Sequence, residues 1–290
     1  IFVFSGFCLT CSKDLLMIKG KASFPFNTIA LAVAFNDELD FLVSEMRRHC
    51  ENHGSMAVFI HYGKKTGDKF MQLSSILTKY GFHDGNSRIY WEQANPVAAI
   101  LQICKHEVVD LLLLGLSQNK NFAQPFGKLT QELSTKAKCS VLIYTSQNAS
   151  MKKIVIEAND HRKTEHALLT AFYFSEREKA DEVIVLDVAE QFASAGSSES
   201  DNFSSEIFSD SRLNSSVERK ALNVKIDTTS VEKGVNVVDY ARKAGAELII
   251  VNSIDHHLQI FEMNSQNHIE AILPELPCHL LIVHSRLVEE

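Results

Sequence analysis

The sequence predicts an α/β protein built from two tandem copies of one doubly wound, mostly parallel, five-stranded sheet. Short apolar runs close each half of the chain: DLLLLG (110–115) and CSVLIY (139–144), then ELIIVN (247–252) and CHLLIV (278–283). Runs of this length without polar alternation suit parallel strands that are covered on both faces. Helical patterns lie between the runs, and alternation of strand and helix predicts a doubly wound sheet. The return of the whole pattern indicates two copies of one domain.

The first copy is expected to hold five strands. They are predicted at residues 28–35, 57–62, 87–91, 110–115 and 141–144. Helices are predicted at residues 37–49, 70–80 and 95–106, with a fourth before the last strand. Asn36 or Asp37 is the expected N-cap of the first helix, since short polar side chains accept hydrogen bonds from exposed backbone N–H groups. Gly81 is expected to end the second helix.

The second copy is expected to repeat this order. Its strands are predicted at residues 152–159, 182–188, 221–227, 247–252 and 278–283, and its first helix at 161–178. Residues 192–216 are serine-rich, acidic and poor in apolar side chains, which predicts a mobile insertion. The predicted organisation is an N-terminal arm (1–25), a first domain (26–148) and a second domain (151–290).

Composition sets bounds on function. The chain has 290 residues, enough for about two domains. Its net charge of -7, without a Lys/Arg block, argues against nucleic-acid binding. Of six cysteines, only Cys8 and Cys11 lie close together, and no second pair completes a zinc site or a disulfide framework. A reducing, cytoplasmic compartment is therefore expected.

The N-terminal segment IFVFSGFCLT allows two interpretations. It is apolar but about half as long as the roughly 20 residues that cross a bilayer. It is either a strand or arm, or the cytoplasmic end of a preceding membrane span followed by Lys13, Lys19 and Lys21. The second interpretation would tether the chain to the inner face of a membrane as part of a longer protein.

With these strands and spacings, residues 26–285 resemble a tandem pair of universal stress protein domains. The resemblance rests on the order of elements and on the loop, helix and Cys-led strand that end each copy, with glycines in the loop of the first copy. It implies an open α/β sheet. Many members of this family bind ATP without an enzymatic reaction, and others bind no nucleotide and act as stress-linked interaction or regulatory modules.

The family's ATP-binding members carry G-x2-G-x9-G-[ST] after the fourth strand, where glycines let backbone N–H groups approach phosphates beside a helix N-terminus. In the first copy Gly115 matches the opening glycine, Gln118 replaces the second, and Lys128 stands where Ser or Thr is expected. Ala34 replaces the Asp that would hold the nucleoside. The resemblance gives the candidate nucleotide-binding residues of this copy as Gly115, Ser117, Gly127 and Lys128.

In the second copy none of the loop glycines is kept. Asp255 falls where phosphates would lie, and like charges a few ångströms apart cost on the order of a few kcal/mol. Gln266 takes the place of the third glycine. The candidate residues here are Asn159, Asn252 and Ser253. Both nucleotide sites are thus expected to be degenerate, with ATP binding in the first copy kept as an alternative.

Other arrangements of reactive residues point to no chemistry. Asp255, His256 and His257 are adjacent, and neighbouring side chains do not converge on a helix face. Cys8 and Cys11 are followed by nothing like a thioredoxin domain. No GxSxG, HExxH or Ser-His-Asp arrangement is found. The prediction is a protein that is not an enzyme and holds no metal.

The last strand of each copy is a candidate pairing element, because apolar edge strands need cover. One begins at Val141 and ends at Tyr144, and the other begins at Leu280 and ends at Val283. They are expected to form a homodimer or an intramolecular pseudo-dimer. Two functions follow: a tandem stress-protein-like module that binds partners, or the cytoplasmic C-terminal regulatory domain of a cation/proton antiporter or similar transporter. An ATP-binding switch in the first copy is the third alternative.

Overall fold

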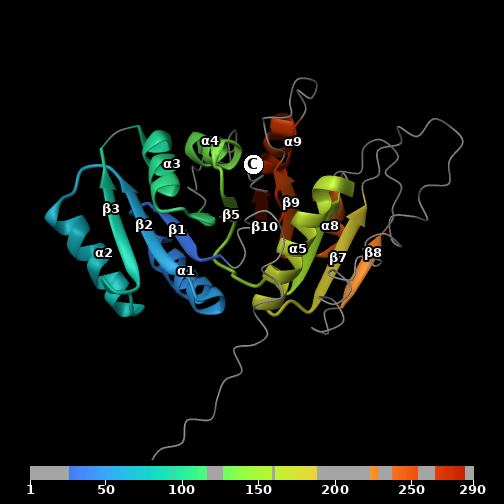
Figure 1. Cartoon of the computed structure of the whole chain (residues 1–290), viewed down its shortest axis with the longest axis horizontal. Coiled ribbons are helices and arrows are strands. Elements are labelled where there is room, and N and C mark those ends of the chain that lie inside the picture. The colour runs from blue at the N-terminus through green and yellow to red at the C-terminus, as the bar shows by residue number, and fades with distance from the viewer. Residues whose placement is uncertain are drawn as a thin grey trace, which may run out of the picture.

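A computed structural model gives the fold of the chain and describes residues 26–93, 95–115, 127–158, 161–187, 223–227, 237–253 and 265–284. The predicted arm (1–25) and the serine-rich segment (192–216) lie outside these residues. The described strands form a single ten-stranded sheet covered by helices (Figure 1). No helix in the described part of the chain combines the length and the apolar character that a membrane span requires.

The first half of the sheet has the order β3-β2-β1-β4-β5, with every pair parallel. Its strands are β1 (Thr28–Val33), β2 (Met56–Tyr62), β3 (Ser87–Glu92), β4 (Leu111–Gly115) and β5 (Ser140–Tyr144). Its helices are α1 (Leu39–His53), α2 (Gly67–Lys79), α3 (Pro96–His106) and α4 (Lys128–Lys136).

The second half continues the sheet in the order β10-β9-β6-β7-β8, again with parallel pairs. Its strands are β6 (Lys153–Ala158), β7 (Glu182–Asp187), β8 (Val224–Asp227), β9 (Leu248–Ser253) and β10 (His279–His284). Its helices are α5 (His161–Arg177), α8 (Val237–Ala244), α9 (Ser265–Ile272) and the short 3-10 turn η4 (Leu273–Glu275). Read from the outer edge inward, the order β8-β7-β6-β9-β10 repeats the order β3-β2-β1-β4-β5 of the first half, which confirms the predicted repeat.

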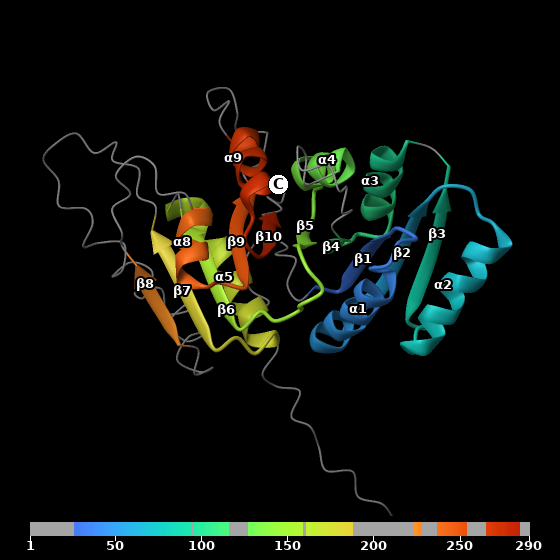
Figure 2. The same cartoon turned by 180° about the vertical axis from the view of Figure 1, so that it is seen from behind.

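The two five-stranded halves are joined edge to edge into one sheet. β5 and β10 pair antiparallel, with Leu142 opposite Leu281 and Val141 opposite Ile282. These strands lie side by side at the centre of the molecule when it is seen from either side (Figures 1 and 2). All residues of β5 are buried. An unpaired apolar edge would expose a row of backbone N–H and C=O groups, and this pairing covers both edges at once.

The core has two layers, one on each face of the sheet. One layer is lined by α1, α2 and α5, through residues such as Leu42, Leu73 and Phe172. The other is lined by α3, α4, α8 and α9, for example through Ile100 and Ile269. Both layers run across the boundary between the halves, so the apolar cover is continuous.

The first helix differs from its predicted span of 37–49. The N-cap is Glu38, not Asn36 or Asp37, and its side chain makes no capping hydrogen bond. The helix continues to His53 because Gly54 adopts a left-handed conformation (φ 70°) that ends it, with the Gly54 N–H bonded to the Cys50 carbonyl. This extra turn places His53 one helical turn beyond His49, on the same face.

Candidate functional site

The carboxyl edge of the first half, between β1 and β4, is where this kind of sheet would bind a ligand. The strand order reverses there, and open α/β sheets bind ligands at such a switch point. Gly115 ends β4 at this edge. A Cβ atom on Gly115 would lie 2.5 Å from Leu42 Cδ1 and 3.3 Å from Glu38 Oε2. The packing of α1 therefore explains this glycine without any phosphate, and Glu38 places a carboxyl group beside it.

The other described candidates of the first copy, Gly127 and Lys128, lie at the start of α4. Gly127 is the N-cap of α4, and a Cβ there would meet nothing within 4 Å. Lys128 has an 88% exposed side chain, which lies 3.8 Å from Glu132 on the next turn of α4. Ser117 lies outside the described residues.

The end of β1, where the family's nucleoside anchor would be, carries apolar and aromatic side chains. Ala34 is exposed and has no polar group. The Phe35 ring stacks on Trp91, with ring centroids 6.0 Å apart, and meets His61 edge-on at 4.7 Å. Lys69 Nζ lies 5.3 Å from the centre of the Phe35 ring. The chain's own rings thus pack at the ends of β1, β2 and β3.

In the second copy, Asn252 and Ser253 end β9, the counterpart of β4. Asn252 is partly buried and pairs in register with Val283 of β10. Asn159 and Asp255 lie outside the described residues. Of the three candidate residues in this copy, the structure therefore describes Asn252 and Ser253.

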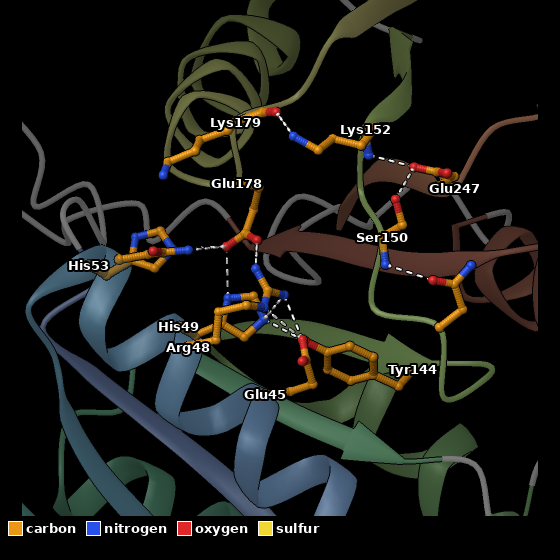
Figure 3. Close-up of polar contacts among 12 residues, drawn as sticks. Glu45, Arg48, His49, His53, Tyr144, Ser150, Lys152, Glu178, Lys179 and Glu247 are labelled. Atoms are coloured by element: carbon orange, nitrogen blue, oxygen red, sulfur yellow. Dashed lines mark hydrogen bonds and ion pairs between the residues drawn. The ribbon is translucent and has the colours of Figure 1, made fainter. Parts of the chain in front are cut away.

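A second group of polar side chains lies between the two halves and was not predicted (Figure 3). It combines side chains from α1 with the tyrosine that ends β5 and the glutamate that follows α5. We call this group the junction cluster; it consists of Glu45, Arg48, His49, His53, Tyr144 and Glu178.

Arg48 joins the two carboxylates of the junction cluster. Its Nη1 bonds Glu178 Oε2, and its Nη2 lies 2.6 Å from Glu45 Oε2. The side chain of Glu178 is 1% exposed and that of Glu45 is 9% exposed. Two nearly buried carboxylates from different copies thus depend on one guanidinium for their charge compensation.

The histidines of the cluster contact the same glutamate. His49 Nδ1 lies 2.9 Å from Glu178 Oε1, and His53 Nε2 lies 3.9 Å from the same oxygen. His49 Nε2 lies 2.5 Å from the Tyr144 hydroxyl, which can donate to Glu45 Oε2 at 3.2 Å.

Burial keeps both rings neutral. Loss of water, followed by the positive charge of Arg48, holds the pKa of His49 well below its usual value. Burial, followed by the charges of Arg177 and Arg48, lowers the pKa of His53 to about 3. The 2.9 Å contact of His49 Nδ1 with Glu178 is therefore made by a neutral ring, and this nitrogen forms no hydrogen bond among the described residues. Burial also raises the pKa of Tyr144, so its hydroxyl keeps its proton.

One more buried histidine fixes the segment that joins the two copies. The Thr145 N–H donates to His279 Nδ1 at 3.1 Å, and His279 Nε2 lies 2.6 Å from the Asn148 carbonyl. Farther along this segment, Ser150 Oγ donates to Glu247 at 2.9 Å (Figure 3). A neutral His279 ring, with its proton on Nε2, satisfies both of its partners.

We expect His279 to make stability depend on pH below about 6.5. Burial lowers its pKa in the folded chain, so the unfolded chain takes up a proton first as the pH falls. Stability is therefore kept above the ordinary histidine pKa and lost below it. Urea unfolding from pH 7.5 to 5 should show a steeper loss for the wild type than for His279→Asn, by at most about 1.4 kcal/mol per pH unit. Equal slopes in the two proteins would contradict this assignment.

A sequence signal for the junction cluster was present. His49 and His53 are four residues apart, a spacing that places two side chains on one helix face. The predicted helix ended at residue 49, which removed His53 from it. Glu178 and Tyr144 are far from the pair in sequence. The fold of the first half brings Tyr144 of β5 to α1, and the pairing of β5 with β10 joins this half to the second one, which carries Glu178.

Comparisons with known proteins agree with this architecture. Residues 151–284 match the family model described as the universal stress protein family. No curated protein matches the chain significantly. Among solved structures, a universal stress protein from Archaeoglobus fulgidus is similar over 90% of this chain and 100% of its own, with a TM-score of 0.64 and 10% identity.

A putative universal stress protein from Pseudomonas aeruginosa is similar over 89% of this chain and 93% of its own, with a TM-score of 0.60 and 14% identity. These two proteins are nearly as long as the chain, and at such identities they establish the fold alone. The second half of the chain, residues 151–284, therefore matches the universal stress protein family, and the chain as a whole has the fold of these tandem-length proteins.

Proposed function

We propose that the chain is a non-catalytic tandem module that acts in stress response or regulation by binding partners, with degenerate nucleotide sites. The observation that carries this proposal is the packing around Gly115. Leu42 fills the space that a close backbone approach would need, and Glu38 lies beside it. Two unit charges of like sign 4 Å apart repel by about 4 kcal/mol at an effective dielectric constant of 20. A phosphate against Gly115 would meet that repulsion.

The remaining features of this edge support the same proposal. Lys128 has an exposed side chain that lies 3.8 Å from Glu132, so a carboxylate of its own helix already faces its charge. Burial raises the pKa of Glu38, which reflects a setting that disfavours negative charge. A triphosphate would bring several negative charges into the same setting.

We also propose that the chain works as an intramolecular pseudo-dimer. β5 pairs with β4 on one side and β10 on the other, and β10 pairs with β9 and β5. Both hydrogen-bonding edges of each strand are thus occupied within one chain. A homodimer through these same strands would require them to separate first.

Thermal unfolding with nucleotide tests the central point. Millimolar Mg-ATP, ADP or AMP is expected to leave the melting temperature unchanged, and incubation with ATP should release no phosphate. Ligand at 100 times its dissociation constant would add about 2.7 kcal/mol, a shift that is easy to detect.

The variant Lys128→Ala separates the alternatives. If ATP stabilised the wild type and this variant lost the effect, the chain would be an ATP-binding switch and the proposal would be wrong. Phosphate release that depends on the folded protein would contradict the non-catalytic role separately.

A further inference from the structure

We propose that His49, His53 and Glu178 bind one divalent cation of the zinc class and so join α1 of the first copy to the end of α5 of the second. Imidazole nitrogens with a carboxylate oxygen are ligands that zinc accepts, whereas Mg²⁺ and Ca²⁺ prefer oxygen ligands alone. The inference does not depend on whether nucleotide binds at Gly115.

The distances suit such an ion. One ligand atom from each of the three residues lies within 4.8 Å of the others. Glu178 Oε1 is 2.9 Å from His49 Nδ1 and 3.9 Å from His53 Nε2. Ligands about 2.0–2.1 Å from a tetrahedral zinc are about 3.3 Å apart, which falls between these two values. Small side-chain rotations would bring both nitrogen-to-oxygen distances to this value.

The buried nitrogens of His53 give an independent reason to expect a ligand. The His53 side chain is 0% exposed, and neither of its ring nitrogens has a hydrogen-bond partner among the described residues. Leaving a buried polar group without a partner costs about 1–3 kcal/mol. A cation bound to Nε2 would satisfy one of the two nitrogens. Nε2 is on the side of the His53 ring that faces Glu178 (Figure 3).

The contacts of His49 can serve a metal-bound ring as well as a free one. Without metal, His49 Nδ1 lies 2.9 Å from Glu178 Oε1 but forms no hydrogen bond among the described residues, while Nε2 accepts from the Tyr144 hydroxyl. With metal at Nδ1, the ring proton moves to Nε2 and is donated to Tyr144, whose own proton turns to Glu45. The ring is neutral in both states, and no proton is gained or lost. Such a partner on the far nitrogen is what fixes metal-bound imidazoles in other proteins.

The charged side chains around the site are balanced without a metal ion. Glu45 and Glu178 bring two negative charges, and Arg48 and Arg177 bring two positive charges that both act on this part of the molecule. Arg48 bonds Oε2 of Glu178, while both histidines approach Oε1. The guanidinium and the cation would therefore use different oxygens of one carboxylate. Water would fill the fourth position of a tetrahedral ion, since the described residues supply three ligands in this group.

The test uses the full chain, stripped of metal by chelator and then titrated with Zn²⁺. We expect one equivalent to bind per chain and the melting temperature to rise, with reversal by EDTA and no effect of Mg²⁺. Co²⁺ should give the visible absorption of tetrahedral nitrogen and oxygen coordination. His53→Gln should weaken Zn²⁺ binding at least 10-fold while keeping the wild-type melting temperature in EDTA.

Two control variants make the result specific. His106→Gln removes a histidine with a 72% exposed side chain outside the cluster and should leave affinity unchanged. His256→Gln/His257→Gln removes the adjacent pair seen in the sequence and should also have no effect. Loss of binding in either control, wild-type affinity in His53→Gln, or no stoichiometric binding by the wild type would overturn the proposal. If His53→Gln fails to fold, zinc X-ray absorption of the wild type decides, because a sulfur ligand would exclude this site.

Discussion

Replacing Arg48 with alanine is expected to lower the free energy of unfolding by about 3 kcal/mol. The variant leaves the carboxylate of Glu178, 1% exposed, without its guanidinium partner, and Glu45 loses the same partner. Removing one member of a buried ion pair is more costly than removing both, because the remaining charge stays desolvated. Urea unfolding at pH 7, monitored by circular dichroism, measures the loss.

The neighbouring arginine provides a matched control. Arg47 lies 2.7 Å from Glu51, but their side chains are 35% and 59% exposed. Arg47→Ala should therefore change stability by less than about 0.5 kcal/mol. The double variant Arg48→Met/Glu178→Gln should recover part of the loss, since no unpaired charge remains at Glu178. Equal losses of unfolding free energy in the Arg47 and Arg48 variants would contradict the claim that Arg48 compensates buried charge in the junction cluster.

Replacing Leu281 with alanine is expected to cost about 3 kcal/mol and to destabilise both halves together. Leu281 is fully buried in β10 and lies opposite Leu142 of β5. Leucine-to-alanine changes in cores cost about 2–5 kcal/mol, because apolar contact is lost and a cavity is left. The core layer around Leu281 contains residues of both halves, so one cooperative transition should shift as a unit.

Two observations check this second expectation. Leu129→Ala, at a position on α4 that is 37% exposed, should have a much smaller effect. Native-state hydrogen exchange should show faster exchange of the amides of both β5 and β10 in the Leu281 variant. Faster exchange confined to residues after 150 would mean that the halves are energetically separate.

Much of the fold could be predicted because local patterns of apolar residues indicate where the strands and helices lie. Unbroken apolar runs located the central strands, and their repetition gave two equivalent halves. The sequence singled out β5 and β10 as strands that need a partner, but it did not decide how they pair. Periodicity shows which face of a strand is buried, but it does not show which distant strand pairs with its edge. A homodimer and an intramolecular pseudo-dimer were therefore both left open, and the structure has the two strands paired within one chain.

The candidate sites were likewise predictable only where they depend on local sequence. Gly115 was located correctly at the end of a strand, but its neighbours Leu42 and Glu38 come from α1 and give the glycine a packing role. The junction cluster depends on a helix end at Gly54 and on a contact between residues more than a hundred positions apart. Neither is visible as a spacing in the sequence.

The central claim is that β5 and β10 pair within one chain, and a disulfide tests it most directly. Val141 and Ile282 lie opposite each other. Opposed Cα atoms in antiparallel strands are about 4.5–5.5 Å apart, within the range that a disulfide spans. The control pairs Val141→Cys with Val283→Cys, whose side chain points to the other face of the sheet.

Oxidation of Val141→Cys/Ile282→Cys is predicted to give a disulfide between these two positions in a protein of monomer mass, as judged by non-reducing electrophoresis and peptide mapping. The control should remain reduced at both introduced cysteines. Covalent dimers linked through positions 141 and 282 would show that the strands pair between chains. Equal cross-linking in the control would show that this register is wrong.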